Sequence, residues 1–151
     1  MKRISIALTI LVTMAATTLT SFTRVPETEE PTGIVFFEGN WEQALAKAAQ
    51  ENKIIFLDAY ASWCGPCKVL KARVFPDEQL GLFYNANFIN VKMDMEKGEG
   101  PQLARKYGIT AYPTLFYLKG DGSVVKKVVG YHDQNQLIAI GEDLMGITDT
   151  Q

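Results

Sequence analysis

Cysteine and histidine are scarce in this chain, and their scarcity excludes most metal chemistry. The 151 residues include two cysteines, Cys64 and Cys67, and one histidine, His132. A structural zinc site needs about four ligands, which these three residues cannot supply within one chain. Covalent haem attachment needs a histidine directly after the second cysteine, and Lys68 occupies that position. We therefore predict no metal site and no bound cofactor.

The chain also lacks an excess of positive charge. It has 15 lysines and arginines against 17 acidic residues, which gives a net charge of −2. Without a basic patch, nucleic acid is not an expected partner. The composition, 47% hydrophobic and 21% charged, is typical of one globular domain large enough to bury a core. We expect this domain to be monomeric.

The apolar stretch at the N-terminus is too short for a membrane span. It runs from Ile4 to Ala16, and a spanning helix needs ~20 apolar residues. Lys2 and Arg3 precede it and small polar residues follow it, which is the layout of a secretory signal. We predict a signal peptide over residues 1–21 and a periplasmic or otherwise exported protein. If the signal is not cleaved, it would tether the chain to a membrane.

Alternating strands and helices are predicted after an acidic, proline-containing leader at residues 22–33. The folded domain is expected to cover residues 34–147. Expected strands are Ile34–Phe37, Lys53–Tyr60, Phe88–Asp94, Thr114–Leu118 and Val124–Val129, and expected helices are Trp41–Glu51, Cys64–Phe75, Glu78–Tyr84, Gly100–Tyr107 and one capped by Asp133 that reaches Met145. This order combines crossovers with a terminal hairpin, so we expect an α/β fold with a mixed sheet and helices on both faces.

The two cysteines form a Cys-x-x-Cys motif at the start of a predicted helix, within Trp63–Cys67. Residues three apart share a helix face, so the two sulfurs lie within bonding reach. A disulfide between them would close almost no loop and would stabilise little, which argues against a structural role. The helix N-terminus favours the thiolate of the first cysteine. We therefore predict that Cys64 is the attacking thiol and that Cys67 resolves the mixed disulfide.

Several segments in the same order resemble the thioredoxin superfamily. The similarity covers roughly residues 34 to 145 and implies a thioredoxin fold. The matching positions are the active-site segment Trp63-Cys64-Gly65-Pro66-Cys67-Lys68, Asp58 six residues before Cys64, Lys92, the segment Lys106-Tyr107-Gly108-Ile109, the segment Tyr112-Pro113-Thr114-Leu115, and Gly130.

Other positions depart from cytosolic thioredoxins. Ala72 stands where those proteins have a proline inside the active-site helix. The segments Val74–Glu78 and Asn87–Lys92 resemble an exported thioredoxin-like group that includes the C-terminal domain of the transmembrane thiol reductant conductor. This resemblance implies protein disulfides as substrates and a membrane thiol reductant as the electron donor.

The leading functional hypothesis is an exported thiol–disulfide oxidoreductase that reduces protein disulfides. Gly65-Pro66 is the thioredoxin dipeptide, and strong oxidants of the superfamily usually differ there. One alternative is a disulfide oxidase or isomerase. Another is a binding module that keeps the fold without turnover, although both cysteines are present.

Asp58 and Lys92 are predicted to assist the dithiol. Asp58 ends a run expected to be buried, and an unpaired buried carboxylate is disfavoured. It could cap a turn, but the resemblance implies that it accepts a proton from Cys67. Lys92 would then moderate the charge of Asp58. The alternative for Lys92 is a residue at the sheet edge that extends its ammonium into water.

Substrate binding is assigned by the same resemblance to Trp63, Gly65, Pro66, Tyr112 and Pro113. Trp63 flanks the motif and is expected to shield the sulfurs and contact partners. Composition alone favours a trans bond before Pro113, because only ~5–6% of such bonds are cis in folded proteins. The resemblance instead implies a cis bond that lets a substrate strand pair beside the disulfide. Tyr112 replaces a smaller residue at a position that touches bound polypeptide in the family.

Overall fold

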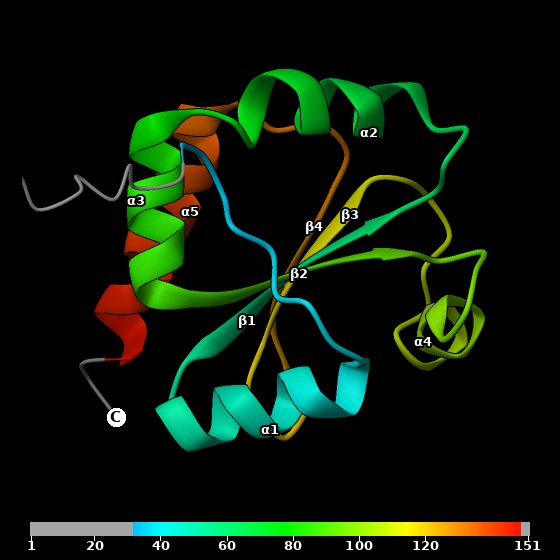
Figure 1. The fold of residues 1–151 in the computed structure, drawn as a ribbon, viewed down its shortest axis with the longest axis horizontal. Coiled ribbons are helices and arrows are strands. Elements are labelled where there is room, and N and C mark those ends of the chain that lie inside the picture. The colour runs from blue at the N-terminus through cyan, green and yellow to red at the C-terminus, as the bar shows by residue number, and fades with distance from the viewer. Residues whose placement is uncertain (1–31, 149–151) are drawn as a thin grey trace, which may run out of the picture.

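A computed structural model describes residues 32–148. The predicted signal peptide and the leader as far as residue 31 lie outside the described residues. The elements, drawn in Figure 1, are α1 (Trp41–Glu51), β1 (Ile54–Tyr60), α2 (Gly65–Val69), the π-helical turn η1 (Leu70–Val74), α3 (Glu78–Asn87), β2 (Phe88–Asp94), α4 (Gly100–Lys106), β3 (Thr114–Leu118), β4 (Val124–Val129) and α5 (Gln134–Thr148).

The four strands form one mixed sheet in the order β2-β1-β3-β4. β1 pairs in parallel with β2 and antiparallel with β3, and β3 pairs antiparallel with β4. Residues Ile54 to Ala59 of the central strand β1 are all buried, as expected for a strand covered on both faces. The register places Asp58 between Lys92 of β2 and Leu115 of β3.

Alternating side chains of β1 divide the core into two clusters, one on each face of the sheet. Ile55 and Leu57 pack with residues of α1 and α4. Ile54 and Phe56 pack with residues of η1, α3 and α5. In Figure 1, α1 lies on one side of the sheet and the pair α3 and α5 on the other. The predicted fold, a mixed sheet with helices on both faces, is therefore confirmed.

The predicted strand Ile34–Phe37 is wrong, because this segment is extended without joining the sheet. Only Phe37 bonds the backbone of β2, through its N–H to the carbonyl of Asn90. Val35 is bonded by side chains instead: Asn85 Oδ1 accepts from its N–H, and Asn90 Nδ2 donates to its carbonyl. These two asparagines replace a strand ladder and leave β2 at the edge of the sheet.

The helix that begins after Cys64 is also less regular than predicted. Five α-helical residues are followed by the π-helical turn η1, in which the Phe75 N–H bonds the Leu70 carbonyl at 2.9 Å. A π-helical turn rotates the following residues relative to an ordinary helix. Leu70 and Val74 of this turn are buried against the sheet. None of the helices in residues 32–148 has the length and apolar character that a membrane crossing requires.

Candidate active site

The two cysteines form a disulfide at the N-terminus of α2. Their Cα atoms are 5.3 Å apart. Cys64 is the N-cap residue, and its Sγ accepts a hydrogen bond of 3.2 Å from the backbone N–H of Cys67. Pro66 lies in the first turn, where a missing N–H costs no helical bond. A thiolate at Cys64 would therefore meet a backbone donor and the positive end of the helix.

Neither sulfur-bearing residue is open to solvent in this disulfide form. Cys64 is 2% exposed and Cys67 is 5% exposed. The two residues cluster with Ala61, and the half-buried side chains of Tyr60 and Tyr112 pack against them. A partner must approach the disulfide between these neighbours.

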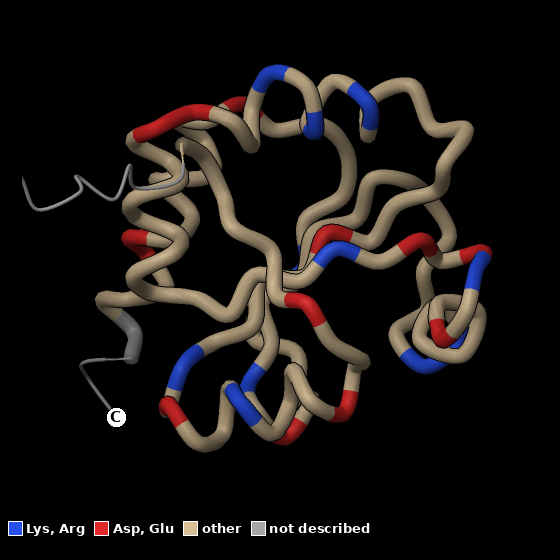
Figure 2. Tube along the Cα trace, viewed as in Figure 1, with Lys and Arg blue, Asp and Glu red and all other residues tan. Residues whose placement is uncertain are grey.

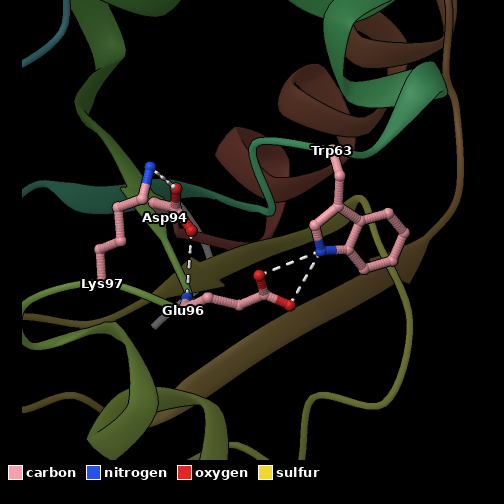
Figure 3. A network of polar contacts seen from close by, with 4 residues as sticks. All are labelled: Trp63, Asp94, Glu96 and Lys97. Atoms are coloured by element: carbon pink, nitrogen blue, oxygen red, sulfur yellow. Dashed lines mark hydrogen bonds and ion pairs between the residues drawn. The ribbon is translucent and has the colours of Figure 1, made fainter.

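Trp63 and Tyr112 lie together beside the disulfide, on what we call its outer side. Trp63 is 65% exposed, and its ring meets that of Tyr112 edge to face at a centroid distance of 5.9 Å. The indole N–H lies 3.0 Å from both carboxylate oxygens of Glu96, as Figure 3 shows. Asp94 in turn accepts from the Glu96 backbone N–H at 3.1 Å and pairs with Lys97 at 3.2 Å. The loop after β2 thus holds the indole in place.

The Tyr112–Pro113 peptide bond is cis, which confirms the conformation predicted from the family resemblance. Two hydrogen bonds hold the surrounding segment. Thr114 Oγ1 donates to the Ala111 carbonyl at 2.7 Å, and the Gly130 N–H donates to the Pro113 carbonyl at 2.8 Å. Pro113 itself is buried.

Asp58 and Cys67 line a cavity on what we call the inner side of the disulfide, which Trp63 and Tyr112 do not line. Asp58 is 5% exposed, and its Oδ1 is buried without a hydrogen-bond partner in the described part of the chain. Burial raises the pKa of Asp58 from 3.8 to about 7, against the opposing effect of the Lys92 charge. A carboxyl with this pKa can accept or release a proton near neutral pH.

Lys92 lies opposite Asp58 in the β1–β2 register but is not ion-paired with it. Its Nζ lies over the ring of Phe36, 4.9 Å from the centroid. The ammonium therefore contacts an aromatic face while it acts on the Asp58 carboxyl through space. Both interpretations of Lys92 made from the sequence are compatible with this position.

A cavity of about 500 Å³ connects this inner side to the surface. Asp58 and Cys67 both line it, whereas Cys64, Trp63 and Tyr112 do not. The carboxyl and the second cysteine therefore share one solvent-accessible space, which the outer residues Trp63 and Tyr112 do not line.

Two contacts of the site have no counterpart in the sequence analysis, those of Glu96 with Trp63 and of Phe36 with Lys92. Glu96 follows a strand with no motif around it, and Phe36 belongs to the segment mistaken for a strand. No local pattern could have assigned either contact. Within residues 32–148, no three histidine, cysteine or acidic side chains gather closely enough to hold a metal ion.

The site combines a Cys-x-x-Cys disulfide at a helix N-terminus with a buried aspartate and a cis-proline. Together with the mixed sheet, these features define a thiol–disulfide oxidoreductase of thioredoxin fold. The thioredoxin-like domain model matches residues 41–145, so the chain belongs to the thioredoxin-like domain family.

Individual relatives support this assignment. The chain is 33% identical over 102 residues to a thioredoxin of Chlorobaculum thiosulfatiphilum, which covers 68% of this chain and 89% of the relative. A solved structure from Bacteroides thetaiotaomicron, of a protein proposed to be a disulphide isomerase, is 44% identical with a TM-score of 0.64 and covers 74% of this chain and 93% of that one.

A third match is a C-terminal domain of DsbD. The reduced C-terminal domain of Neisseria meningitidis DsbD is 26% identical, with a TM-score of 0.56, and covers 68% of this chain and 91% of that domain. This match supports the resemblance found in the sequence.

Proposed function

We propose that the protein is an exported reductase of protein disulfides. The observation that carries this proposal is the placement of the Cys64–Cys67 disulfide, with the first cysteine at the N-terminus of α2 and the second beside the Asp58 cavity. The Gly65-Pro66 dipeptide and the similarity to thioredoxins support the reducing direction.

The reduced protein begins the reaction with the Cys64 thiolate. Its Sγ attacks one sulfur of the partner's disulfide, so a mixed disulfide forms and the other partner sulfur leaves as a thiolate. The Cys67 N–H, which already bonds Cys64 Sγ, and the end of α2 stabilise the attacking anion. The partner's chain would lie across Trp63, Gly65, Pro66, Tyr112 and Pro113.

Cys67 completes the reaction from the inner side. Asp58 accepts the thiol proton of Cys67, and the resulting thiolate attacks Cys64 Sγ. The Cys64–Cys67 disulfide forms, and the second partner sulfur leaves as a thiolate that takes up a proton. The partner gains two electrons, and this chain loses two. Lys92 tunes the step through its effect on the Asp58 carboxyl.

Export is supported by the predicted signal peptide at residues 1–21 and by the similarity to the DsbD C-terminal domain. An exported reductase cannot draw directly on reductants of the cytosol, so we propose that a membrane thiol reductant returns the two electrons to the oxidised pair. Fractionation of cells that express the full chain should recover a processed protein outside the cytoplasm. A full-length chain held in the membrane would instead indicate a tether.

A disulfide isomerase is the second candidate, favoured by the 44% identity to the Bacteroides protein. The reduction potential distinguishes a reductase from an isomerase. No charged residue lies between the cysteines to stabilise the thiolate unusually, so we expect a low potential. Equilibration with thiol–disulfide buffers should give a value nearer ~ −270 mV, as in thioredoxin, than the ~ −120 mV of a strong oxidase. A potential above about −180 mV would favour the isomerase or oxidase.

A further inference from the structure

The cavity on the inner side of the disulfide has the size of a small-molecule site. Its volume of about 500 Å³ lies within the ~300–1,000 Å³ that such sites occupy. It lies between the segment that precedes α1, the end of β1, and the helix formed by α2 and η1. Its lining residues come from these elements and from β2 with the following loop.

One part of the lining is apolar. Phe36 and Phe75 line the cavity and meet edge to face, with ring centroids 5.3 Å apart. Ile34 and the half-buried Tyr60 extend this surface. An apolar ring or chain of a ligand could be buried here, and burial of apolar area is the main source of affinity in such pockets.

A second part is strongly basic. Four lysines line the cavity: Lys68, Lys71, Lys92 and Lys97. Lys97 is paired with Asp94, whereas Lys68 and Lys71 form no ion pair with any residue that the structure describes. Figure 2 shows the basic residues grouped along α2 and η1. The unpaired ammonium groups leave positive charge at this end of the cavity.

The innermost polar group is the Asp58 carboxyl. Asp58 is 5% exposed and lines the cavity, and its Oδ1 lacks a hydrogen-bond partner among the described residues. Burial of this carboxyl is costly, so a molecule in the cavity that bonds its accessible part gains free energy.

We propose that this cavity is a binding site for an amphipathic organic anion, an aromatic carboxylate or sulfonate. Its apolar body lies against Phe36 and Phe75, its anionic group meets Lys68 and Lys71, and a polar substituent reaches the Asp58 carboxyl. The site is separate from the surface proposed for protein partners, because Cys64, Trp63 and Tyr112 do not line it. A bound anion covers the Cys67 side of the disulfide and leaves the Trp63 side open.

Calorimetric titration of the oxidised full-length protein with 8-anilinonaphthalene-1-sulfonate tests the proposal. Lys71→Glu and Arg73→Glu change the net charge equally and both lie in η1, but only Lys71 lines the cavity. We expect one site, weakened at least about fivefold by Lys71→Glu and by less than about twofold by Arg73→Glu. Absence of binding, or equal weakening by both variants, would overturn the proposal.

The position of the bound probe is read from amide and indole signals by NMR. The largest shifts are expected at residues 34–36 and 71–75, with the Trp63 indole N–H unchanged. Shifts centred on Trp63 and Tyr112 would place the probe on the outer side and refute the site.

The pH dependence adds a test specific to Asp58. As Asp58 ionises between pH 6 and 8, its negative charge should weaken binding at least about threefold. Asp58→Asn should remove this dependence. That variant keeps the other charged groups that face the cavity, which are Lys68, Lys71, Lys92, Lys97 and Asp94. Tyr60 also lines the cavity, but burial raises its pKa further above this pH range. An unchanged pH dependence in the variant would contradict contact with Asp58.

Discussion

The two sides of the Cys64–Cys67 disulfide differ in almost every physical respect. On the outer side, Trp63 is 65% exposed and is held by hydrogen bonds to Glu96 at the surface. On the inner side, Asp58 is 5% exposed and has an oxygen without a hydrogen-bond partner in the described chain. The outer side exposes aromatic surface, and the inner side holds a carboxyl whose pKa is raised to about 7 by burial.

We propose that this difference gives the two thiols separate tasks. Cys64 caps the helix, and the backbone N–H of Cys67 would stabilise its anion. Cys67 shares a cavity with the carboxyl that can take its proton. Exchange with a partner and closure of the internal disulfide can therefore be disturbed independently, and the following changes are ordered by the size of the expected effect.

Cys64→Ser should reduce the turnover of a protein disulfide to the background rate, a loss of at least about 10³-fold, because the attacking sulfur is gone. An insulin-type reduction assay measures it. Ser62→Ala, a change at an exposed neighbour, serves as the control and should retain activity. Residual turnover in Cys64→Ser would support a reaction that begins on the inner side.

Asp58→Asn should change the pH dependence of stability. Between pH 3.8 and about 7 the folded protein keeps a proton that the unfolded chain has released, so the free energy of unfolding falls as pH rises through this window. The variant lacks this fall. Its stability relative to the unaltered protein should be greater at pH 8 than at pH 5 by roughly 2–3 kcal/mol.

Denaturant unfolding of the two oxidised proteins measures this difference, since disulfide-bonded cysteines do not titrate. Glu38→Gln removes an exposed carboxylate and should give the same difference at both pH values. Parallel pH curves for Asp58→Asn and the unaltered protein would show that the Asp58 carboxyl is ionised throughout.

Lys92→Met should raise the pKa of Asp58 further, because the lysine charge now lowers it. The titration of the Asp58 carboxyl, followed by carbon NMR in the oxidised protein, should move to higher pH. Lys119→Met, at the β3–β4 hairpin, removes the same charge elsewhere and should leave the titration in place. If Lys92→Met also leaves it in place, Lys92 is only a residue of the sheet edge.

Glu96→Ala should affect the outer side alone and by the smallest amount. Loss of the bond to the Trp63 indole should raise KM for a protein disulfide about fivefold, the value of one hydrogen bond, while the rate with a small aromatic disulfide stays the same. Glu96→Gln keeps an acceptor and should restore most of the affinity. An equal loss with the small disulfide would mean that Glu96 acts on the sulfurs instead.

Local signals in the sequence were sufficient for much of the fold. Asn40 caps α1 by accepting from the Gln43 N–H, and the helix runs from Trp41 to Glu51 as predicted. Ile34–Phe37 shows the limit of such signals, since an apolar run does not reveal whether its backbone will find a strand. Here the side chains of Asn85 and Asn90 bond this segment in place of a neighbouring strand, and no local sequence pattern predicts these bonds.

Some residues of the site can likewise be found from local signals in the sequence, and others cannot. Cys64, Cys67 and Asp58 stand at fixed spacings on one strand and the helix after it, so a motif can locate them. Glu96 reaches Trp63 across 33 positions through a loop conformation, which depends on the packing of the whole domain. The π-helical turn η1, in which Leu70 and Val74 are buried, likewise has no sequence motif that predicts it.

The proposal to be tested is that Cys64 exchanges with the partner on the outer side and that Cys67 resolves the product from the inner side. Its most direct test is to mix reduced Cys67→Ser and reduced Cys64→Ser, separately, with a disulfide-bonded protein and to quantify mixed disulfides after acid quenching. We predict that Cys67→Ser accumulates a stable mixed disulfide through Cys64 and that Cys64→Ser accumulates almost none. Preferential trapping through Cys67 would show that the two cysteines have the opposite roles.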